Sequence, residues 1–328
     1  MRTARLRQGY GEVSPQRFAR RRKRADEAAR ERACRGVRGA KPLGVIMKQP
    51  RRTATVERRA QPRVADGKWR TGLTSIAPNK ILVRGYPLDE IMGRLTFGEA
   101  IYLLLLGECP TPGIGRLMEA ILVSFIDHGA TPPSTLAARN TATTGASLRA
   151  CVAAGVLGFG RYHGGDIESC MEFLDAGLAL VRDGSSYTEA AAQIVDRWKD
   201  TGDALPGFGH RFHTRDPRAA RLFQMALELE VEGTHIQMIR AVEMLLHTRH
   251  QADQPPLPIN IDGAIAAVCS DLGMPPTVAN ALFIISRVPG IAAQAQEEMN
   301  REHPMRQIDP KDYIYDGPSE RRLPERRK

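Results

Sequence analysis

The chain has 328 residues, 42% of them hydrophobic and 26% charged, which is enough to bury a large core and to form two domains. Its net charge of +10 is uneven, because residues 1–60 hold 19 Lys and Arg against 5 Asp and Glu, while the rest is mildly acidic. This distribution excludes a body that binds nucleic acid through its net charge, and no apolar run approaches the roughly 18 residues of a membrane-spanning helix.

The basic excess lies in residues 1–58, which have few apolar residues and no regular apolar face. Such a composition predicts a disordered extension. Three interpretations stay open for it: contacts to the phosphates of a polyanion, a transit peptide, or translation that starts at Met47 and leaves residues 1–46 unmade. The acidic residues in "ADEAARERA" disfavour the transit peptide. Residues 319–328 form a second, shorter basic tail.

A short hairpin is expected near residues 68–85, and from about residue 95 onward the pattern is helical almost throughout. Thr96 and Glu99 form a capping box before the apolar run "IYLLLLGE", which predicts a buried helix, and Ser186 with Glu189 repeat this arrangement. Apolar residues at three- and four-residue spacing predict further helices over residues 113–129, 144–160, 218–230, 234–250 and 277–299. The predicted fold class is therefore mainly α.

The five cysteines are an odd number and include no Cys-x-x-Cys pair. Free thiols in a reducing compartment are the simplest interpretation, so a cytoplasmic protein is expected.

Four polar clusters interrupt the helices: "IDHGATPPSTLAAR" with His128, "GRYHGGDIE" with His163, "LPGFGHRFHTRDPR" with His210, and "LPINIDGAIAAV" with Asp262. Each has a structural explanation when taken singly. His128 and Asp262 suit opposite ends of helices, the glycines around His163 suit turns, and Arg218 suits a solvated helix face. Together, however, the two glycine-flanked histidines and a carboxylate beside an apolar helix make an acid–base set.

The residue types indicate what this set can do. A glycine beside a histidine lets a ligand approach closely, and the apolar neighbours of Asp262 would raise its pKa toward neutrality. Arg218 and Arg287 can hold carboxylates through two parallel hydrogen bonds. The pairs "HRFH" and "HTRH" lack the glutamate of a His-Glu-x-x-His motif and a nearby cysteine pair, so no metal site is expected.

Three stretches resemble, in order and spacing, the signature segments of the citrate synthase superfamily: "GRYHGGDIE", "LPGFGHRFHTRDPRAARLF" and "NIDGAIAAVCSDLGMP". The similarity covers roughly residues 66–318. It implies a homodimer of mostly helical subunits, each with a discontinuous large domain (59–165 and 263–318) and a small domain (166–262). The active site would lie in the cleft between the two domains.

The resemblance also implies roles for the three acid–base residues. His163 would hydrogen-bond the thioester oxygen of acetyl-CoA, His210 would lie beside the oxaloacetate carbonyl, and Asp262 would exchange the methyl proton. Making or breaking the carbon–carbon bond passes through a thioester enolate, whose oxygen needs a donor and whose carbon needs a proton partner.

Binding roles follow from the same resemblance. The oxaloacetate carboxylates would be held by His128, Arg218, Arg287 and, for the arginine supplied across the dimer, Arg306. Coenzyme A would meet the loop backbone at Gly207, Phe208 and Gly209. The thioester is then a substrate, and no metal or redox cofactor is expected.

Departures from the synthase pattern favour a lyase of tricarboxylic acid metabolism. Gly263 follows Asp262 where typical synthases have an aromatic residue, Gln294 replaces a histidine, and Asp166 adds a carboxylate after the His163 motif. We therefore expect cleavage of citryl-CoA to acetyl-CoA and oxaloacetate. Alternatives are a citrate or 2-methylcitrate synthase-type acyltransferase, and a non-catalytic binding protein.

Overall fold

The computed structural model describes residues 69–160, 163–164, 166–210, 213–250 and 257–324. They belong to one compact unit, which begins at Trp69. The basic N-terminal extension, the alternative start at Met47 and the last four residues lie outside the described residues, so the predictions about them stay predictions.

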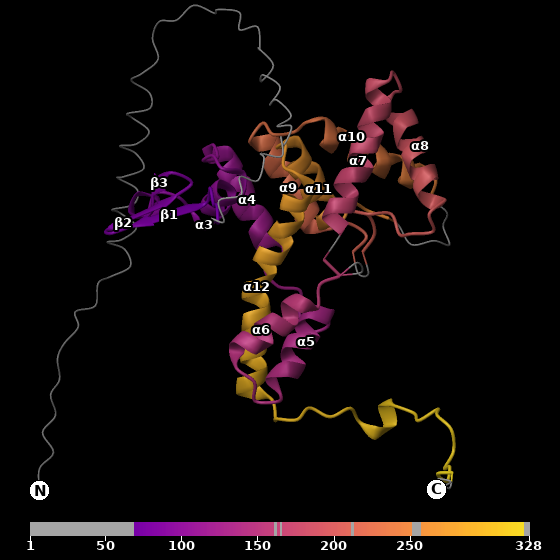
Figure 1. Ribbon diagram of the computed structural model, residues 1–328. Helices are drawn as coiled ribbons and strands as arrows, with labels where there is room; N and C mark the ends of the chain where they lie inside the picture. The colour runs from indigo at the N-terminus through magenta and orange to yellow at the C-terminus, as the bar shows by residue number, and fades with distance from the viewer. Residues whose placement is uncertain (1–68, 161–162, 165, 211–212, 251–256, 325–328) are drawn as a thin grey trace, which may run out of the picture. The chain divides into compact units, whose positions relative to one another are not determined.

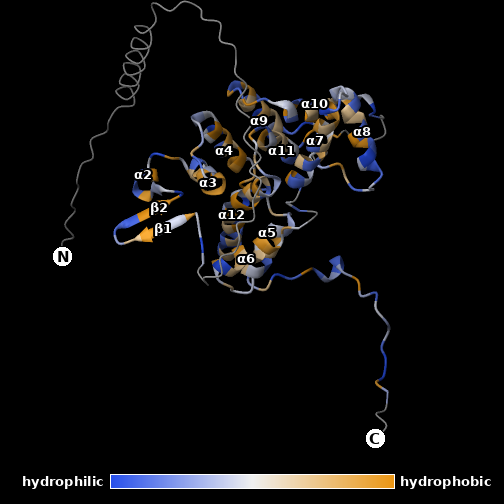
Figure 2. Cartoon of the chain, turned by 45° about the horizontal axis from the view of Figure 1, so that its top comes forward, coloured by the Kyte–Doolittle hydropathy of each residue, from blue (hydrophilic) through white to orange (hydrophobic). Residues whose placement is uncertain are grey.

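A small antiparallel sheet opens this unit, with strands β1 (Thr74–Ala77), β2 (Lys80–Val83) and β3 (Tyr86–Pro87) in sequence order (Figure 1). Ala77 pairs with Lys80 across a tight turn in which Asn79 has a φ of 57°. The hairpin predicted near residues 68–85 is confirmed. Ile76 on β1 is 77% exposed, whereas Leu82 and Val83 on β2 are partly buried. Figure 2 shows hydrophobic residues along β1 and β2.

Two helices begin with the predicted capping boxes. The Thr96 side chain accepts from the Glu99 amide at the start of α3 (Phe97–Leu106), and the Glu99 carboxylate accepts from the Thr96 amide. Ser186 and Glu189 make the same pair of bonds before α8 (Tyr187–Lys199). Local sequence therefore determines where both helices start.

The other helices of the described residues are α2 (Leu88–Ile91), α4 (Pro112–Ser124), α5 (Pro133–Ala142), α6 (Leu148–Leu157), α7 (Asp166–Arg182), α9 (Pro217–Glu228), α10 (Thr234–Thr248), α11 (Ile261–Asp271) and α12 (Pro276–Arg301), with a 3₁₀ turn η1 at Pro310–Asp312. Three of them, α2, α5 and α7, were not predicted from the apolar periodicity. Helices α5 and α7 begin inside the polar clusters of His128 and His163, and α5 has the low mean hydropathy of a helix rich in Ser, Thr, Arg and Asn.

Helix α11 lies at the centre of the larger core and packs against α7, α9 and α10. Residues 263–269 are all buried, and most of them are small. Small side chains let neighbouring helix backbones approach closely, as the alanine- and glycine-rich sequence predicts. The division into a large and a small domain stays a prediction.

Helix α12 crosses between two cores. Its first half joins the larger core, and its second half packs on α5 and α6 around Ala138, Cys151 and Ile291. With 26 residues and a hydropathy of 1.3 over its most apolar window, α12 is long and apolar enough to cross a membrane, contrary to the sequence-based expectation. However, it packs against five other helices and buries the charged residues Arg287 and Glu298, so we assign it as a core helix.

Candidate functional site

The candidate site is built around two short segments, residues 207–209 and 258–260, which are joined by an isolated antiparallel bridge between Phe208 and Ile259. The Gly209 amide donates to Pro258 O (2.8 Å), and the Asn260 amide donates to Gly207 O (3.0 Å). The Asn260 side chain donates to Gly209 O (3.1 Å). It also accepts from the Gly263 amide, and this hydrogen bond makes Asn260 the N-cap of α11. This junction places His210, the next residue of the loop, near the first turn of α11.

Glycine is required on both sides of the junction. Gly207 has a φ of 79°, and a Cβ atom there would lie 2.7 Å from the Gly263 Cα. A Cβ atom on Gly263 would overlap the Gly207 carbonyl oxygen. Gly263, noted in the sequence as a departure from the synthase pattern, therefore has a structural cause: the loop backbone occupies the space of a side chain.

Asp262 is the second residue of α11, and its surroundings disfavour the ionised form of its carboxyl group. Desolvation and the neighbouring Asp166 raise the pKa of Asp262 to about 7, although the positive charges of Arg218 and Arg287 oppose the rise. Asn260, and not Asp262, caps the helix. Within the described residues the Asp262 carboxylate makes no hydrogen bond or ion pair, so it is available to exchange a proton near neutral pH.

Arg218 is anchored at the start of α9 by Asp216, a buried residue that the sequence analysis did not single out. Arg218 Nε and Nη2 donate to the two Asp216 carboxylate oxygens (3.0 and 2.8 Å). The same carboxylate accepts from the Ile261 amide (3.1 Å), which ties α9 to α11. Burial alone would raise the pKa of Asp216, but the hydrogen bonds and charge of Arg218 outweigh it and lower the pKa.

Arg287 on α12 is buried, and not all of its hydrogen-bond donors have partners among the described residues. Its Nε donates to Phe125 O (2.7 Å), and its guanidinium lies 5.0 Å from the centre of the Phe283 ring. Its Nη1 is buried without a hydrogen-bond partner among the described residues. Since an orphaned buried donor is costly, this nitrogen is suited to an anionic ligand.

His128 lies beyond the C-terminus of α4, close to the same charges. Desolvation lowers the pKa of His128, and Arg287, Arg218 and His210 lower it further, while Asp127 opposes them. The His128 and His210 rings lie 6.3 Å apart, nearly perpendicular to each other. The helix-end explanation considered from the sequence does not hold, because α4 ends at Ser124.

His210 is oriented by a second histidine. The two rings of His210 and His213 stack at 4.3 Å, and the His213 backbone N–H donates to His210 Nδ1 (3.2 Å). A neutral ring that accepts at Nδ1 carries its proton on Nε2.

His163 is held on the other side of the site by Ser134 of α5. The Ser134 hydroxyl lies 2.8 Å from His163 Nε2, and the serine is fully buried. A serine that donates to Nε2 leaves the ring proton on Nδ1. Gly164, with a φ of 88°, leaves room for the Phe283 ring, which also packs near His163.

The structure thus brings most of the predicted residues together. Charge interactions or ring contacts link His128, His210, Arg218, Arg287 and Asp262, and the Gly207–Gly209 loop adjoins them. His163 joins this group through Phe283, over which Arg287 lies. Arg306 is not brought to the site within one chain, since it pairs with Glu298 at the far end of α12. Its role across a dimer stays a prediction.

Sequence reasoning missed three supporting residues: Asp216, Ser134 and Asn260. For two of them, the sequence contains a pattern typical of a helix N-cap. Asp216 stands before a proline and an arginine, as a helix N-cap does, and Asn260 stands three residues before Gly263 at the start of an apolar run. Ser134 had none, because its contact with His163 spans 29 residues.

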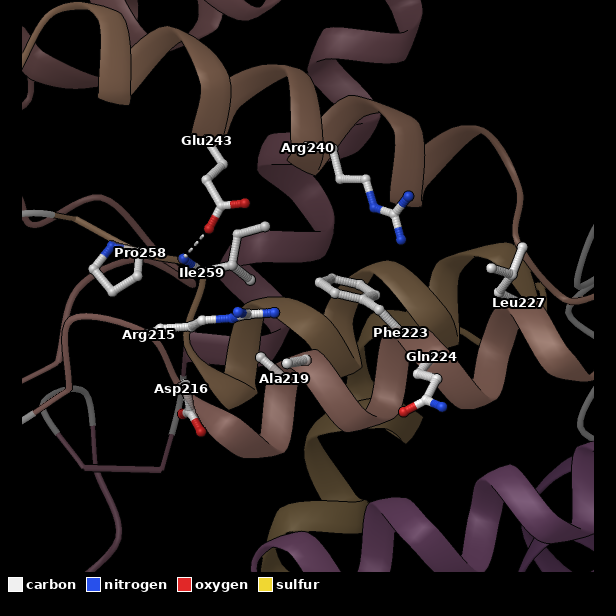
Figure 3. A pocket seen from close by; sticks show the side chains of 11 residues that line it. Arg215, Asp216, Ala219, Phe223, Gln224, Leu227, Arg240, Glu243, Pro258 and Ile259 are labelled. Atoms are coloured by element: carbon white, nitrogen blue, oxygen red, sulfur yellow. Dashed lines mark hydrogen bonds between the residues drawn. The ribbon is translucent and has the colours of Figure 1, made fainter.

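A pocket of 340 Å³ lies beside the site, between α9, α10 and residues 258–259. Figure 3 shows Arg240 reaching from α10 toward Phe223 on α9, while Glu243 accepts a hydrogen bond from the Ile259 amide (3.0 Å). The pocket shares Asp216 with the site. In the described part of the chain, no group of His, Cys, Asp and Glu side chains is arranged to hold a metal ion.

Two solved structures share this arrangement of helices. Citryl-CoA lyase from Hydrogenobacter thermophilus matches with a TM-score of 0.70 and 41% identity, over 78% of this chain and 97% of that one. An ATP citrate lyase from Methanosaeta concilii, solved with (3S)-citryl-CoA, matches with a TM-score of 0.67 and 18% identity, over 94% of this chain and 51% of that one. The chain is therefore a mainly helical protein with the citrate synthase fold.

Sequence comparison identifies the family to which the chain belongs. Residues 110–308 match the family described as "Citrate synthase, C-terminal domain". Citrate synthases from Deinococcus radiodurans and Heyndrickxia coagulans are 29% and 27% identical over 205 and 210 residues, which are 61% and 62% of this chain. The chain spans about half the length of these curated relatives, 51% and 52%. It belongs to the citrate synthase family.

Proposed function

We propose that this protein cleaves citryl-CoA into acetyl-CoA and oxaloacetate. The observation that carries the choice of a lyase is the 41% identity to the Hydrogenobacter thermophilus citryl-CoA lyase, which this chain matches over 97% of that protein's length. The citrate synthases are matched over only about half of theirs. The backbone contact between Gly207 and Gly263 supports the same choice, since it leaves no space for the aromatic residue expected in a synthase.

Asp262 supplies the carbon acid–base chemistry in this proposal. Cleavage breaks the carbon–carbon bond and leaves its electron pair on the departing acetyl thioester as an enolate, whose carbon must receive a proton. A carboxyl group with a pKa of about 7 is substantially protonated at neutral pH and can deliver that proton. The buried, unpaired Nη1 of Arg287 and the anchored guanidinium of Arg218 would hold substrate carboxylates.

The two histidines act on oxygens. In the tautomer in which Ser134 donates to Nε2, His163 would donate from Nδ1 to the thioester oxygen as the enolate forms. His210 would take the hydroxyl proton of citryl-CoA as the new carbonyl forms. Accepting at Nε2 requires the neutral ring to carry its own proton on Nδ1, so the contact from the His213 amide must be released when substrate binds.

The proposal also includes two binding partners, coenzyme A and a second copy of the chain. Coenzyme A would lie along the backbone of the Gly207–Gly209 loop, whose positive φ values at both glycines turn the chain sharply. A homodimer would cover exposed apolar side chains such as Leu157, which is 84% exposed. A cytoplasmic location stays a prediction.

A second candidate is synthase-type condensation of an acyl-CoA with oxaloacetate, favoured by the similarity to citrate synthases. It uses the same residues, with Asp262 as the base instead of the acid. The non-catalytic alternative would leave the raised pKa of Asp262 and the orphaned donor of Arg287 without a role.

The deciding experiment supplies citryl-CoA to the purified full chain, to a chain that lacks residues 1–58, and to the Asp262→Asn variant. Oxaloacetate is followed through malate dehydrogenase and NADH, and free CoA with a thiol reagent. Oxaloacetate without free CoA, lost in the variant, supports the lyase. Free CoA with citrate supports the synthase-type enzyme. If no product forms and the variant equals the parent, the lyase proposal fails, and the protein acts on a different thioester or is not an enzyme. Activity that survives removal of residues 1–58 also separates the enzyme from a binder acting through its tail.

A further inference from the structure

We propose that Gln294 is a positioning residue, whose amide holds the His128-bearing loop on α12 and thereby sets the affinity of the site for a substrate carboxylate. This inference rests on the proposed function. It concerns a residue outside the acid–base set, one which the sequence showed only as a replacement for histidine.

The loop that follows α4 is attached along one face of α12. Arg287 Nε donates to Phe125 O (2.7 Å), and the Ile126 carbonyl and Asp127 Cα press directly on Gly290, where a Cβ atom has no space. Gln294 Nε2 donates to the Asp127 carboxylate (3.2 Å to Oδ2). Positions 287, 290 and 294 share one face of a helix. His128 is therefore the next residue after a segment attached to α12 at three successive points.

The two hydrogen-bond partners of Gln294 require a side chain with both a donor and an acceptor. Its Oε1 accepts from Arg139 Nη1 of α5 (2.8 Å), and its Nε2 donates to Asp127. An arginine can only donate and an ionised aspartate can only accept, so a neutral side chain with one donor and one acceptor is needed between them. The Asp127 carboxylate also accepts from the Gly129 amide (3.1 Å), which closes the loop around His128.

The attachment continues away from the site. Arg139 Nη2 also pairs with the buried Glu298 (2.7 Å), and Glu298 binds Arg306 of the C-terminal segment. Glu298 lies eleven residues, or about 16 Å of helix, from Arg287. Gln294 therefore links the ion cluster of Arg139, Glu298 and Arg306 to the loop that carries His128.

Asp127 carries the effect into the site because its charge acts on both His128 and Arg287. Loss of the Gln294 amide would release the Asp127 side chain and widen the range of positions of His128. Substrate binding would weaken, while Asp262 and His163, which lie on other elements, would keep their geometry.

The test compares Gln294→Leu, Gln294→Glu and Gln294→His with the parent and with a matched surface control, Gln193→Leu on α8. The measurements are kcat and KM for citryl-CoA cleavage, the Kd of oxaloacetate by calorimetry, and hydrogen–deuterium exchange of residues 125–130. We expect Gln294→Leu to raise KM and Kd about tenfold with kcat within about threefold, and to speed exchange in this loop. Gln294→Glu, which repels Asp127, should weaken binding further.

The conservative variant separates positioning from general destabilisation. A neutral histidine has one donor and one acceptor, so Gln294→His should recover most of the affinity at about pH 8. A fall in kcat with unchanged KM, or loop exchange equal to that of Gln193→Leu, would overturn the proposal. A parent protein that neither cleaves citryl-CoA nor binds oxaloacetate refutes the proposed function, and with it the claim on affinity. The exchange rates then still report whether Gln294 holds the loop.

Discussion

Replacing Asp262 by asparagine should stabilise the fold at high pH while it abolishes activity. Burial raises the pKa of this carboxyl from 3.8 to about 7. Because the folded state prefers the protonated form, the parent protein loses stability as pH rises from about 4 to about 7, and the loss is complete above that range. Asparagine keeps the shape of the side chain and removes the charge.

The magnitude follows from the same two pKa values. Moving the pKa from 3.8 to about 7 corresponds to about 4 kcal/mol as an upper bound, at roughly 1.4 kcal/mol per pKa unit. Roughly 2.5 kcal/mol of this develops between about pH 5 and pH 8. At about 2 °C per kcal/mol, the variant should gain about 5 °C in Tm relative to the parent over that interval.

Thermal unfolding followed by circular dichroism across this pH range measures the effect. The exposed residue Asp183 at the end of α7 provides the control, since Asp183→Asn changes the same net charge without touching the site. A difference between Asp262→Asn and the parent that stays constant from about pH 5 to pH 8 would refute the argument. It would show that the Asp262 carboxylate is solvated in the folded protein.

Three further outcomes are expected. The cleavage rate kcat/KM for citryl-CoA should fall as pH rises through about 7, because the protonated form of Asp262 is the acid; a cleavage rate that rises there would refute this role of Asp262. Gly263→Ala should cost about 1–3 kcal/mol in urea unfolding, because the new methyl group overlaps the backbone of the facing loop, whereas Gly72→Ala, at a position with open space, supplies a control for the loss of a glycine. His235 bridges Asp271 (2.9 Å) and Asp175 (3.0 Å), and these bonds outweigh burial and raise its pKa. Its stabilisation is complete below its unfolded pKa and is lost as pH rises through the raised folded pKa, so His235→Ala should destabilise more at about pH 5.5 than at about pH 9, and an equal cost at both would count against the bridge.

Much of this protein follows from local sequence. The capping boxes at Thr96 and Ser186 and the periodic apolar residues predict where helices lie, because those signals act within a few residues of the chain. The glycine-flanked histidines and Asp262 could be selected as an acid–base set for the same reason. Helices α5 and α7 escaped this reasoning because their first turns lie inside the polar clusters of His128 and His163.

Tertiary structure alone decided how the chemistry is tuned. The pKa of Asp262 depends on desolvation beside the larger core and on Asp166, which lies 96 positions earlier in the chain. The requirement for Gly263 depends on the carbonyl of Gly207, and the hydrogen bonds of Gln294 depend on Asp127. Sequence spacing gives no information on such pairs, since desolvation, steric overlap and hydrogen bonding act through space between segments that only folding brings together.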